Sequence, residues 1–304
     1  MTIDASVIIP SLGRLDQLRN CIGGVLSQDS DYVIEIVVVV DGLDSESLAK
    51  TIESEFRGRA ELLFDSSLER RGSAAAKNIG AHKAQGDLLV FIDDDTVPAR
   101  SWLRSIIESY SDDVVGVGGS ERKRGRQPFL RRLLFFIQGN RTGRVTKSGM
   151  VISNFTPEKK SNVYVDCLPG CNMSFRREVF LQSGGFDENY VGTAYREETD
   201  FCMRIRPHGK LLFVPIAVVD HAEHEYGGNS PSSYRDWNYW YHRNNTYFFL
   251  KNFRPVSKPL WVRHCLVELT IAVSRMFLSL DPSPIGTMRS GIADGKKMSA
   301  GLRG

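Results

Sequence analysis

Three consecutive carboxylates follow directly on a short apolar run. Residues 88–92 read Leu-Leu-Val-Phe-Ile, and Asp93, Asp94 and Asp95 come next. A run of this kind between turn-forming segments predicts a buried parallel strand whose carboxyl end opens into a crevice, where open α/β sheets bind ligands. Adjacent carboxylates repel one another unless a cation neutralises them, and hard divalent cations prefer carboxylate oxygens. The segment therefore predicts a divalent cation, Mn²⁺ or Mg²⁺, that serves an anionic substrate.

A histidine follows a second apolar run in the same manner. Residues 211–219 are apolar, and Asp220 and His221 come after them, so the imidazole is also expected at a strand end. Imidazole nitrogen is an acceptable ligand for manganese-like cations. The alternatives are a histidine that only makes hydrogen bonds and a competing ligand in the nearby His224.

Glu197, Glu198 and Asp200 stand where a helix over residues 201–205 should begin. The dipole of a helix stabilises carboxylates at its amino end, and this explains any one of the three. It does not explain three acids beside the glycine-rich segment 184–187, which is expected to bring backbone close to a ligand. We therefore regard the three acids as candidate catalytic residues.

Asp41 and a group of cations are candidates for contacts with a bound base or phosphate. Asp41 ends the apolar run 34–40 and can accept a hydrogen bond from a base imide, although an Asp-Gly turn explains it equally well. Arg71 and Lys77, close to Asn78, are placed to meet phosphate or base. The alternative is that these cations are solvated on an exposed helix face.

The first hundred residues alternate β-rich runs with helical patterns. Strands are predicted at 7–9, 34–40, 62–64 and 88–92. Apolar residues at three- and four-residue steps predict helices over 15–26 and 48–56, an alanine-rich helix over 73–84, and a fourth helix that begins at Pro98. This order is typical of βαβ units and predicts an α/β fold.

Composition excludes several classes of protein. The chain has 304 residues, 41% hydrophobic and 25% charged, and a formal net charge of +3, which gives no sign of nucleic-acid binding. The five cysteines are odd in number and scattered, as expected of buried thiols in a reducing compartment. Cys167 and Cys171 lack a second Cys/His pair that would complete a zinc site. With no signal-peptide pattern and no apolar run of ~18 residues, we expect a cytoplasmic protein that does not span a membrane.

Two segments raise the question of contact with a membrane surface or a partner. Residues 122–136 place cations beside aromatic residues and leucines, which suits an anionic membrane or a mobile loop next to a core helix. In residues 260–280 a narrow polar stripe of His264, Glu268 and Arg275 lies among apolar residues. The apolar face must be covered by the catalytic domain, by a second copy or by lipid. The tail from Asp281 onward is expected to be loosely ordered.

Over residues 5–225 several motifs occur in the order found in the family 2 glycosyltransferases of the GT-A fold, and the chain resembles that family. The opening strand and loop are matched by Val7-Ile8-Ile9-Pro10-Ser11-Leu12-Gly13-Arg14, and the strand end that contacts the nucleotide by Val39-Val40-Asp41-Gly42. The G-x-x-x-A-R-N-x-G helix is matched by Gly72 to Gly80, the D-x-D element by Asp93-Asp94-Asp95, and the late histidine by Val219-Asp220-His221. The acceptor-half motifs are matched by Gly170 to Arg177, Gly185 to Glu188 and Glu197-Glu198-Thr199-Asp200.

The resemblance implies an α/β fold, GT-A-like and Rossmann-like, with a mostly parallel central sheet flanked by helices and a helical C-terminal extension. It implies a catalytic domain over 1–228, with a nucleotide-sugar half at about 1–97 and an acceptor half at 98–228, and an extension over 229–304. The implied function is metal-dependent, inverting transfer of a sugar from a nucleotide diphosphate, UDP by family habit, to an acceptor hydroxyl in glycan or glycoconjugate synthesis.

The resemblance also implies roles for individual residues. Asp95 is expected to bind the metal, Asp93 to contact the ribose or the metal with its water, and His221 to complete the metal shell. Asp94 is expected near the donor or turned back to the protein. Glu198 would accept the proton of the acceptor hydroxyl, while Glu197 or Asp200 hold the acceptor or neighbouring cations. The implied donor contacts are Pro10, Arg14, Asp41, Lys77, Asn78, Asp93 and Asp94.

Two departures from the family pattern bear on these roles. The usual Asp-Asp-Gly-Ser is shortened to Asp41-Gly42-Leu43-Asp44, which leaves the identity of the nucleotide base open. The usual Glu-Asp-x-Asp is Glu197-Glu198-Thr199-Asp200, so the side chain of the candidate proton acceptor is one methylene longer. A sugar nucleotidyltransferase would need a Gly-rich basic loop after the first strand, where residues 10–14 offer one glycine and one arginine. A non-catalytic carbohydrate-binding relative would have no need of the retained acids. Sugar, acceptor, peripheral membrane attachment and a homodimer stay open.

Overall fold

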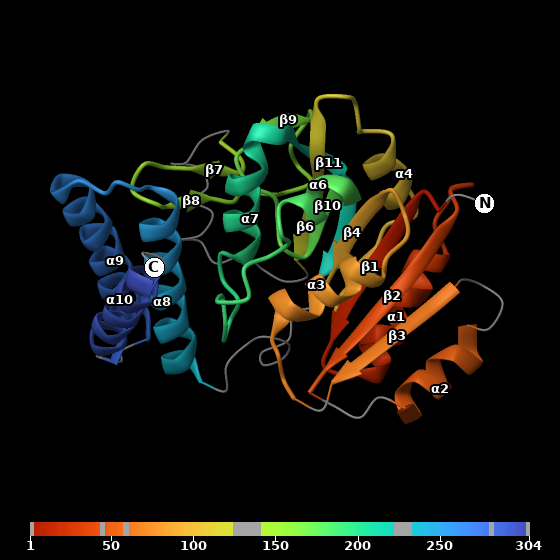
Figure 1. Ribbon diagram of the computed structural model, residues 1–304, viewed down its shortest axis with the longest axis horizontal. Helices are drawn as coiled ribbons and strands as arrows, with labels where there is room; N and C mark the ends of the chain where they lie inside the picture. The colour runs from red at the N-terminus through yellow and green to blue at the C-terminus, as the bar shows by residue number, and fades with distance from the viewer. Residues whose placement is uncertain are drawn as a thin grey trace.

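The structure, a computed structural model, describes residues 3–42, 46–56, 61–67, 69–123, 141–221, 233–279 and 283–301. Within these residues a central sheet of nine strands carries helices on both faces, and three long helices stand together at one side (Figure 1). The predicted α/β fold with a mostly parallel sheet and a helical C-terminal extension is confirmed. The predicted boundary at residue 228 falls outside the described residues.

The strand order in the sheet is β3-β2-β1-β4-β10-β6-β11-β5, with β9 paired to β11. Neighbours β3, β2, β1 and β4 are parallel, β10 is antiparallel to both β4 and β6, and β11 is parallel to β6. The two short strands β5 and β9 are antiparallel to β11. The strands are β1 (Ala5–Ser11), β2 (Ile34–Asp41), β3 (Glu61–Ser67), β4 (Leu88–Ile92), β5 (Thr96–Pro98), β6 (Val114–Lys123), β9 (Val163–Val165), β10 (Asn172–Arg176) and β11 (Lys210–His221), with a separate ribbon of β7 (Arg144–Val145) and β8 (Val151–Ile152).

Successive side chains of the buried strands enter two different cores, as the period of a strand requires. Val7 and Ile9 pack against α1, α2 and α4, whereas Ile8 packs on the other face against α3, α6 and α7. These helices are α1 (Leu15–Leu26), α2 (Glu46–Phe56), α3 (Ser73–Lys83), α4 (Trp102–Ile107), α6 (Arg177–Gln182) and α7 (Glu197–Ile205), which ends in the 3₁₀ turn Arg206–His208.

Five phenylalanines fix α6 and α7 on the sheet. Their ring centroids lie 4.7 to 6.4 Å apart, and all five side chains are at most 2% exposed. Because two come from β4 and β10, one from α6, one from the loop after it and one from α7, the cluster determines where α7 begins relative to the sheet. The five are Phe91, Phe175, Phe180, Phe186 and Phe201.

Two expectations about helices are wrong. The fourth helix begins at Trp102 rather than Pro98, because residues 96–98 instead form β5. The tail is not loosely ordered over residues 283–301: these form α10 (Ser283–Gly301), packed on α8 (Tyr234–Asn252) and α9 (Lys258–Ser279). Its glycines allow the close approach, since a Cβ at Gly291 would lie 2.7 Å from a backbone oxygen of α8. None of the described helices is both long and apolar enough to cross a bilayer.

Candidate active site

The aspartate triplet forms the turn between β4 and β5. The turn is closed on itself, because the Thr96 backbone N–H and hydroxyl both donate to the Asp93 carbonyl, at 3.1 and 2.7 Å. β5 then pairs antiparallel with the end of β11, and Thr96 lies opposite His221. This pairing brings the acidic turn and the histidine together although they are more than a hundred residues apart in the chain.

Asp93, Asp95 and His221 each direct a ligand atom to one place, and these atoms lie within 4.8 Å of one another. His221 Nε2 is 3.1 Å from Asp95 Oδ1. Burial raises the pKa of Asp93 to about 6, an effect that Lys77 opposes and Asp95 reinforces. Burial acts to lower the pKa of His221, but the carboxylates of Asp95 and Glu121 raise it to about 10. The acids thus favour the protonated imidazole when no cation is bound, and a cation held at Nε2 would displace that proton.

This donor set fits a divalent cation. Two carboxylate oxygens and one imidazole nitrogen are ligands that Mn²⁺ accepts, and Mg²⁺ accepts the carboxylates. The three groups also come from two rigid strand ends, so little ordering would be needed to bind an ion.

Glu121, in β6, holds the far side of the histidine and was not found by sequence reasoning. Its Oε1 lies 2.5 Å from His221 Nδ1, which leaves Nε2 directed to Asp95. Cys171 Sγ lies within 4.8 Å of ligand atoms of Glu121 and His221. A carboxylate on the second nitrogen of a metal-binding histidine orients the ring and makes it a stronger ligand. The parallel pairing of β6 with β11 places Glu121 beside the histidine, and the sequence alone does not reveal that pairing.

Asp94 is turned back to the protein. Its carboxylate accepts a hydrogen bond from the Ser11 hydroxyl at 2.6 Å and is paired with the Arg14 guanidinium. Arg14 also lies 3.4 Å from Asp95. Burial raises the pKa of Asp94 although both partners act to lower it. Ser11 and Arg14 thus fix the acidic turn to the end of β1, beside the half-buried Pro10.

Glu197, the first residue of α7, is occupied by a buried ion pair. Lys77 Nζ from α3 lies 2.5 Å from its Oε1, and Ser73 donates to the same oxygen at 3.0 Å. Both charged side chains are 4% exposed. Burial acts to lower the pKa of Lys77, but Glu197 and Asp93 raise it. The structure therefore places Lys77 in the link between α3 and α7 rather than in a solvated position.

Glu198 is the more accessible of the two neighbouring glutamates. It is half-buried, accepts a hydrogen bond from the Thr199 hydroxyl at 2.9 Å, and lies under the backbone at Gly170, where a Cβ would be 3.7 Å from its side chain. Burial and then Glu197 raise its pKa. A carboxylate of raised pKa is a stronger proton acceptor near neutral pH.

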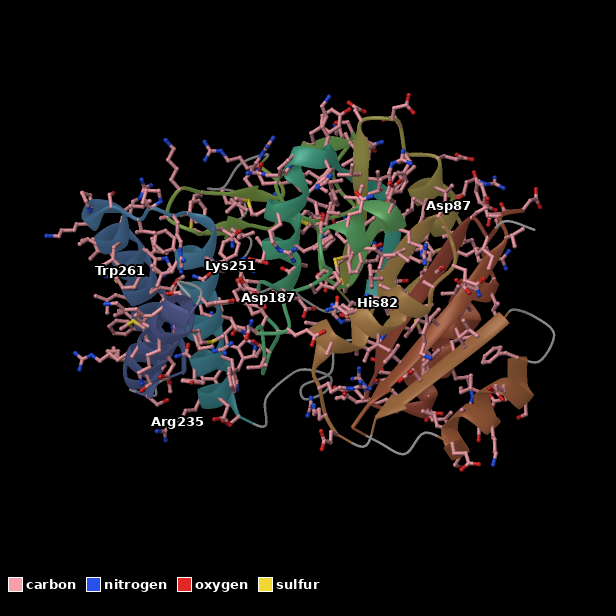
Figure 2. All side chains as sticks on the ribbon, in the orientation of Figure 1. His82, Asp87, Asp187, Arg235, Lys251 and Trp261 are labelled. Atoms are coloured by element: carbon pink, nitrogen blue, oxygen red, sulfur yellow. The ribbon has the colours of Figure 1, made fainter. Side chains whose placement is uncertain are left out.

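Asp200 lies in the interface between α7 and α8 rather than beside Glu198. Its carboxylate is fully buried, and both oxygens accept hydrogen bonds from the protein: from Tyr190, Arg204, Lys251 and Asn252, at 2.8 to 3.2 Å. Lys251 also pairs with Asp187 at 2.7 Å, and the two side chains point toward one another in Figure 2. The position suits an anchor for α7 and leaves no acceptor site for a substrate.

Asp41 and Asn78 also bind protein groups. The two oxygens of Asp41 accept the backbone N–H groups of Arg71 and Gly72 at 2.7 and 2.8 Å, so Asp41 holds the start of α3. The Asn78 amide donates to the Phe186 carbonyl and accepts from its N–H, at 2.9 and 2.8 Å. Of the predicted donor contacts, these two therefore hold the backbone before α3 and at Phe186 in place.

The start of α7 is held in an uncommon backbone conformation. Arg196, immediately before Glu197, has φ 82° and is 3% exposed. Its Nε donates to Asn245 of α8 at 2.8 Å. Such strain persists where the surrounding structure holds it and is often found at functional sites. The C-terminal helices thereby help to fix the direction of the first turn that carries Glu198.

Comparison with known families gives a match over more than half of the chain. The model of glycosyl transferase family 2 matches residues 6–183. The matched region contains the acidic turn, β10 and α6, and it ends before α7.

Two curated relatives are similar to this chain over most of its length. The glucosyl-dolichyl phosphate glucuronosyltransferase of Haloferax volcanii is 26% identical over 237 residues, which cover 74% of this chain and 71% of that protein. The pre-mycofactocin glycosyltransferase of Mycobacterium tuberculosis is 25% identical over 241 residues, 77% of this chain. The chain spans 44% of the length of the mycobacterial relative.

Solved structures share the fold. The mannosyltransferase PcManGT of Pyrobaculum calidifontis, in complex with GDP-Man and Mn²⁺, has a TM-score of 0.59 at 21% identity and covers 99% of this chain and 79% of its own. TarS of S. aureus, in complex with UDP-GlcNAc, has a TM-score of 0.62 at 15% identity, with 96% and 80% covered. The predicted GT-A-like architecture is confirmed.

Proposed function

The chain belongs to glycosyl transferase family 2, and we propose that it transfers a sugar from a nucleotide diphosphate to an acceptor hydroxyl with the help of a divalent cation. It is an enzyme of glycosyl transfer. The observation that carries the finer proposal is the convergence of Asp93, Asp95 and His221 within 4.8 Å at the edge of the sheet. In open α/β sheets this edge, at the carboxyl ends of the strands, is where ligands bind.

Asp95 and His221 would hold the cation directly, with Asp93 as a third ligand or as a contact to ribose or a bound water. A cation held by these residues would supply positive charge that stabilises the departing diphosphate. Arg14 and Ser11 keep the acidic turn in place through Asp94, and Glu121 keeps Nε2 of His221 directed to the same point.

Glu198 is the general base of the proposed reaction. Glu197 is neutralised by Lys77, whereas Glu198 is half-buried, has a raised pKa and faces no cation at hydrogen-bond distance among the described residues. Neighbouring carboxylates whose environments differ in this way take different roles. Glu198 would accept the proton of the acceptor hydroxyl, whose attack opposite the diphosphate inverts the anomeric carbon.

We propose a UDP-linked donor and an acceptor in glycan or glycoconjugate synthesis. The TarS complex with UDP-GlcNAc supports UDP, and the PcManGT complex with GDP-Man makes guanine the competing base. The name of the Haloferax relative, a glucosyl-dolichyl phosphate glucuronosyltransferase, supports a lipid-linked acceptor among the candidates. The five free cysteines support a cytoplasmic location.

A thermal-shift panel tests the metal and the donor together. A ligand that binds only the native state raises the melting temperature. We expect UDP to raise it in the presence of Mn²⁺ and not after chelation, and we expect Asp95→Ala to remove that response. Asp112→Ala, which changes an exposed aspartate, is the matched control. Equal stabilisation without the cation, or in the Asp95 variant, would contradict the proposal.

Glu198→Gln tests the base separately from binding. The amide keeps the shape of the side chain but accepts no proton, so donor binding should persist while nucleotide release from a panel of UDP-sugars and acceptors falls by about 10²-fold or more. Glu178→Gln, on the exposed face of α6, should leave both unchanged. Full turnover in Glu198→Gln would move the role of base to another residue.

A further inference from the structure

Helix α9 turns its polar side chains inward. His264 and Glu268 are fully buried. His264 donates from Nδ1 to the Ser148 carbonyl at 3.0 Å and stacks on Phe249, and Glu268 pairs with His242 and accepts from Asn245 at 2.5 Å. These partners come mainly from α8. The narrow polar stripe predicted from sequence is therefore the face that attaches α9 to the rest of the molecule.

Arg275, the third residue of the polar stripe, also faces α8. The guanidinium of Arg275 lies 4.5 Å from the centroid of the Trp237 ring and 4.0 Å from that of Tyr241, and it donates to Asn238 at 2.7 Å. Together with His264 and Glu268 it fixes the rotation of α9 along most of its length. The rotation is thus set by polar contacts, and the apolar side of the helix is turned outward.

The outward side of α9 is a row of large apolar side chains. Val262 is 54% exposed, Leu266 58%, Leu269 40% and Phe277 71%. They follow one another at helical steps and share one face of the helix. Of the three covers considered from the sequence, the catalytic domain is not the one found among the described residues, because these side chains are exposed. We call the four residues the α9 face. Exposed apolar rows of this extent mark binding surfaces.

The charges around the α9 face are positive. Lys258 and Arg263 are exposed on the same helix, and the acid of α9, Glu268, is buried. Lys296 of α10 lies 5.9 Å from the ring of Trp261 at the same end of the helix. Residues 253–304 contain eight Lys and Arg against three Asp and Glu, although the whole chain has a net charge of only +3.

We propose that the α9 face docks on an anionic lipid surface. A row of exposed Leu, Val and Phe bordered by Lys and Arg is the composition of helices that lie in the interface of a bilayer. Of the described helices, α9 lies farthest from the sheet, with α8 between it and α7 (Figure 1). The α9 face is therefore exposed on the outermost of these helices.

Charge decides against a second copy of the chain as the occupant. Pairing of two α9 helices would place Lys258 and Arg263 opposite like charges or uncharged residues in either direction, because the described part of α9 exposes no carboxylate. Anionic headgroups supply the missing negative charge, at ~1 kcal/mol per Lys or Arg near the surface. The inference is independent of the proposed reaction, since it involves neither donor nor cation.

Co-sedimentation of the whole chain with vesicles tests the proposal. We expect binding to phosphatidylcholine vesicles that contain about one third phosphatidylglycerol, at least ~10-fold weaker binding to phosphatidylcholine alone, and loss of the difference at high salt. Failure to bind the anionic vesicles at low salt would overturn the proposal. So would a dimer in sedimentation velocity, without lipid, that the variants below dissociate.

Matched variants locate the surface. Leu266→Glu with Phe277→Glu should reduce vesicle binding at least ~10-fold, while Ile216→Glu, which changes a 68% exposed side chain on β11, should not. Lys258→Ala with Arg263→Ala should reduce binding to anionic vesicles and weaken its dependence on salt. All altered side chains are exposed, so the variants should melt like the parent. Unchanged binding in the Leu266 and Phe277 variant, or an equal loss in the Ile216 variant, would refute the assignment.

Discussion

Replacing Lys77 by methionine separates a structural role for this residue from direct contact with the nucleotide. The substitution keeps most of the side-chain volume and removes the charge. Glu197 would then keep one hydrogen-bond partner, the hydroxyl of Ser73, while its Oε2 has none among the described residues. A buried carboxylate that loses its cation is strongly destabilising, because it remains charged in a medium of low polarity.

The expected loss is ~3–5 kcal/mol in the free energy of unfolding, the cost of removing one partner of a buried pair. Lys50→Met is the matched control: Lys50 and Glu46 also meet at 2.5 Å, but their side chains are 71% and 74% exposed. An exposed pair at this helical spacing contributes less than ~0.5 kcal/mol. The two substitutions remove contacts between the same kinds of atoms at the same distance. The loss in the free energy of unfolding should nevertheless be about sixfold or more larger for Lys77→Met than for Lys50→Met, because only the first pair is buried.

Urea unfolding at neutral pH measures both losses. A double variant, Lys77→Met with Glu197→Leu, removes the stranded charge and should recover most of the stability. The reasoning would be refuted if Lys77→Met cost no more than Lys50→Met. If Lys77→Met were as stable as Lys50→Met and also bound UDP more weakly than the parent, Lys77 would instead be a donor contact, as the family resemblance implies.

Three further predictions follow from single sites. Burial acts to raise the pKa of Asp187, but Lys251 and other hydrogen-bond donors lower it to about 2. The ionised side chain therefore contributes ~2 kcal/mol to the free energy of unfolding above its ordinary pKa of 3.8, and this contribution is lost as the pH falls toward 2. The difference in urea stability between the parent and Asp187→Asn should narrow by ~1 kcal/mol from pH 6 to pH 3. Gly119→Ala should cost ~3 kcal/mol or more, because its Cβ would lie 1.9 Å from a carbonyl oxygen of β11, whereas Gly23→Ala, with nothing within 4 Å, should raise the melting temperature slightly. Glu121→Gln should weaken Mn²⁺ binding ~10–100-fold in a calorimetric titration, and equal affinity would contradict its role in orienting the histidine.

The sheet could be predicted from sequence because its strands are buried on both faces. Residues 88–92 were predicted as a strand, and β4 has those bounds. β2 extends one residue beyond its prediction, to Asp41. A parallel strand covered by helices on both faces is apolar at nearly every position, so the signal is local and does not depend on the partner strands. The acids at the strand ends were found for the same reason.

Contacts that depend on the pairing of distant strands could not be predicted. Thr96 meets His221 only because β5 turns back along β11, and Pro98 had suggested the start of a helix instead. Glu121 lies next to the basic segment beginning at Arg122, where a carboxylate looks like an ordinary solvated charge. Its position against the histidine follows from the register of β6 with β11. Residues 124–136, where membrane contact was considered, lie outside the described residues.

The orientation of α9 could not be predicted from sequence for a different reason. Periodicity identifies two faces of a helix but does not say which one is buried. Here α8 offers His242, Asn245 and Asn238 as partners, and Glu268 and Arg275 of α9 meet them only when they face α8. Leaving a buried charge unpaired costs more than exposing leucine, so the polar stripe takes the inner side.

Binding of Mn²⁺ to the chain in the presence of UDP, measured by the loss of the electron paramagnetic resonance signal of free Mn²⁺, tests the central proposal most directly. We expect one tightly bound ion per chain, with at least ~10-fold weaker binding in Asp95→Ala and in His221→Ala. Unchanged binding in both variants, or undiminished sugar transfer after exhaustive chelation, would contradict a cation site formed by Asp93, Asp95 and His221.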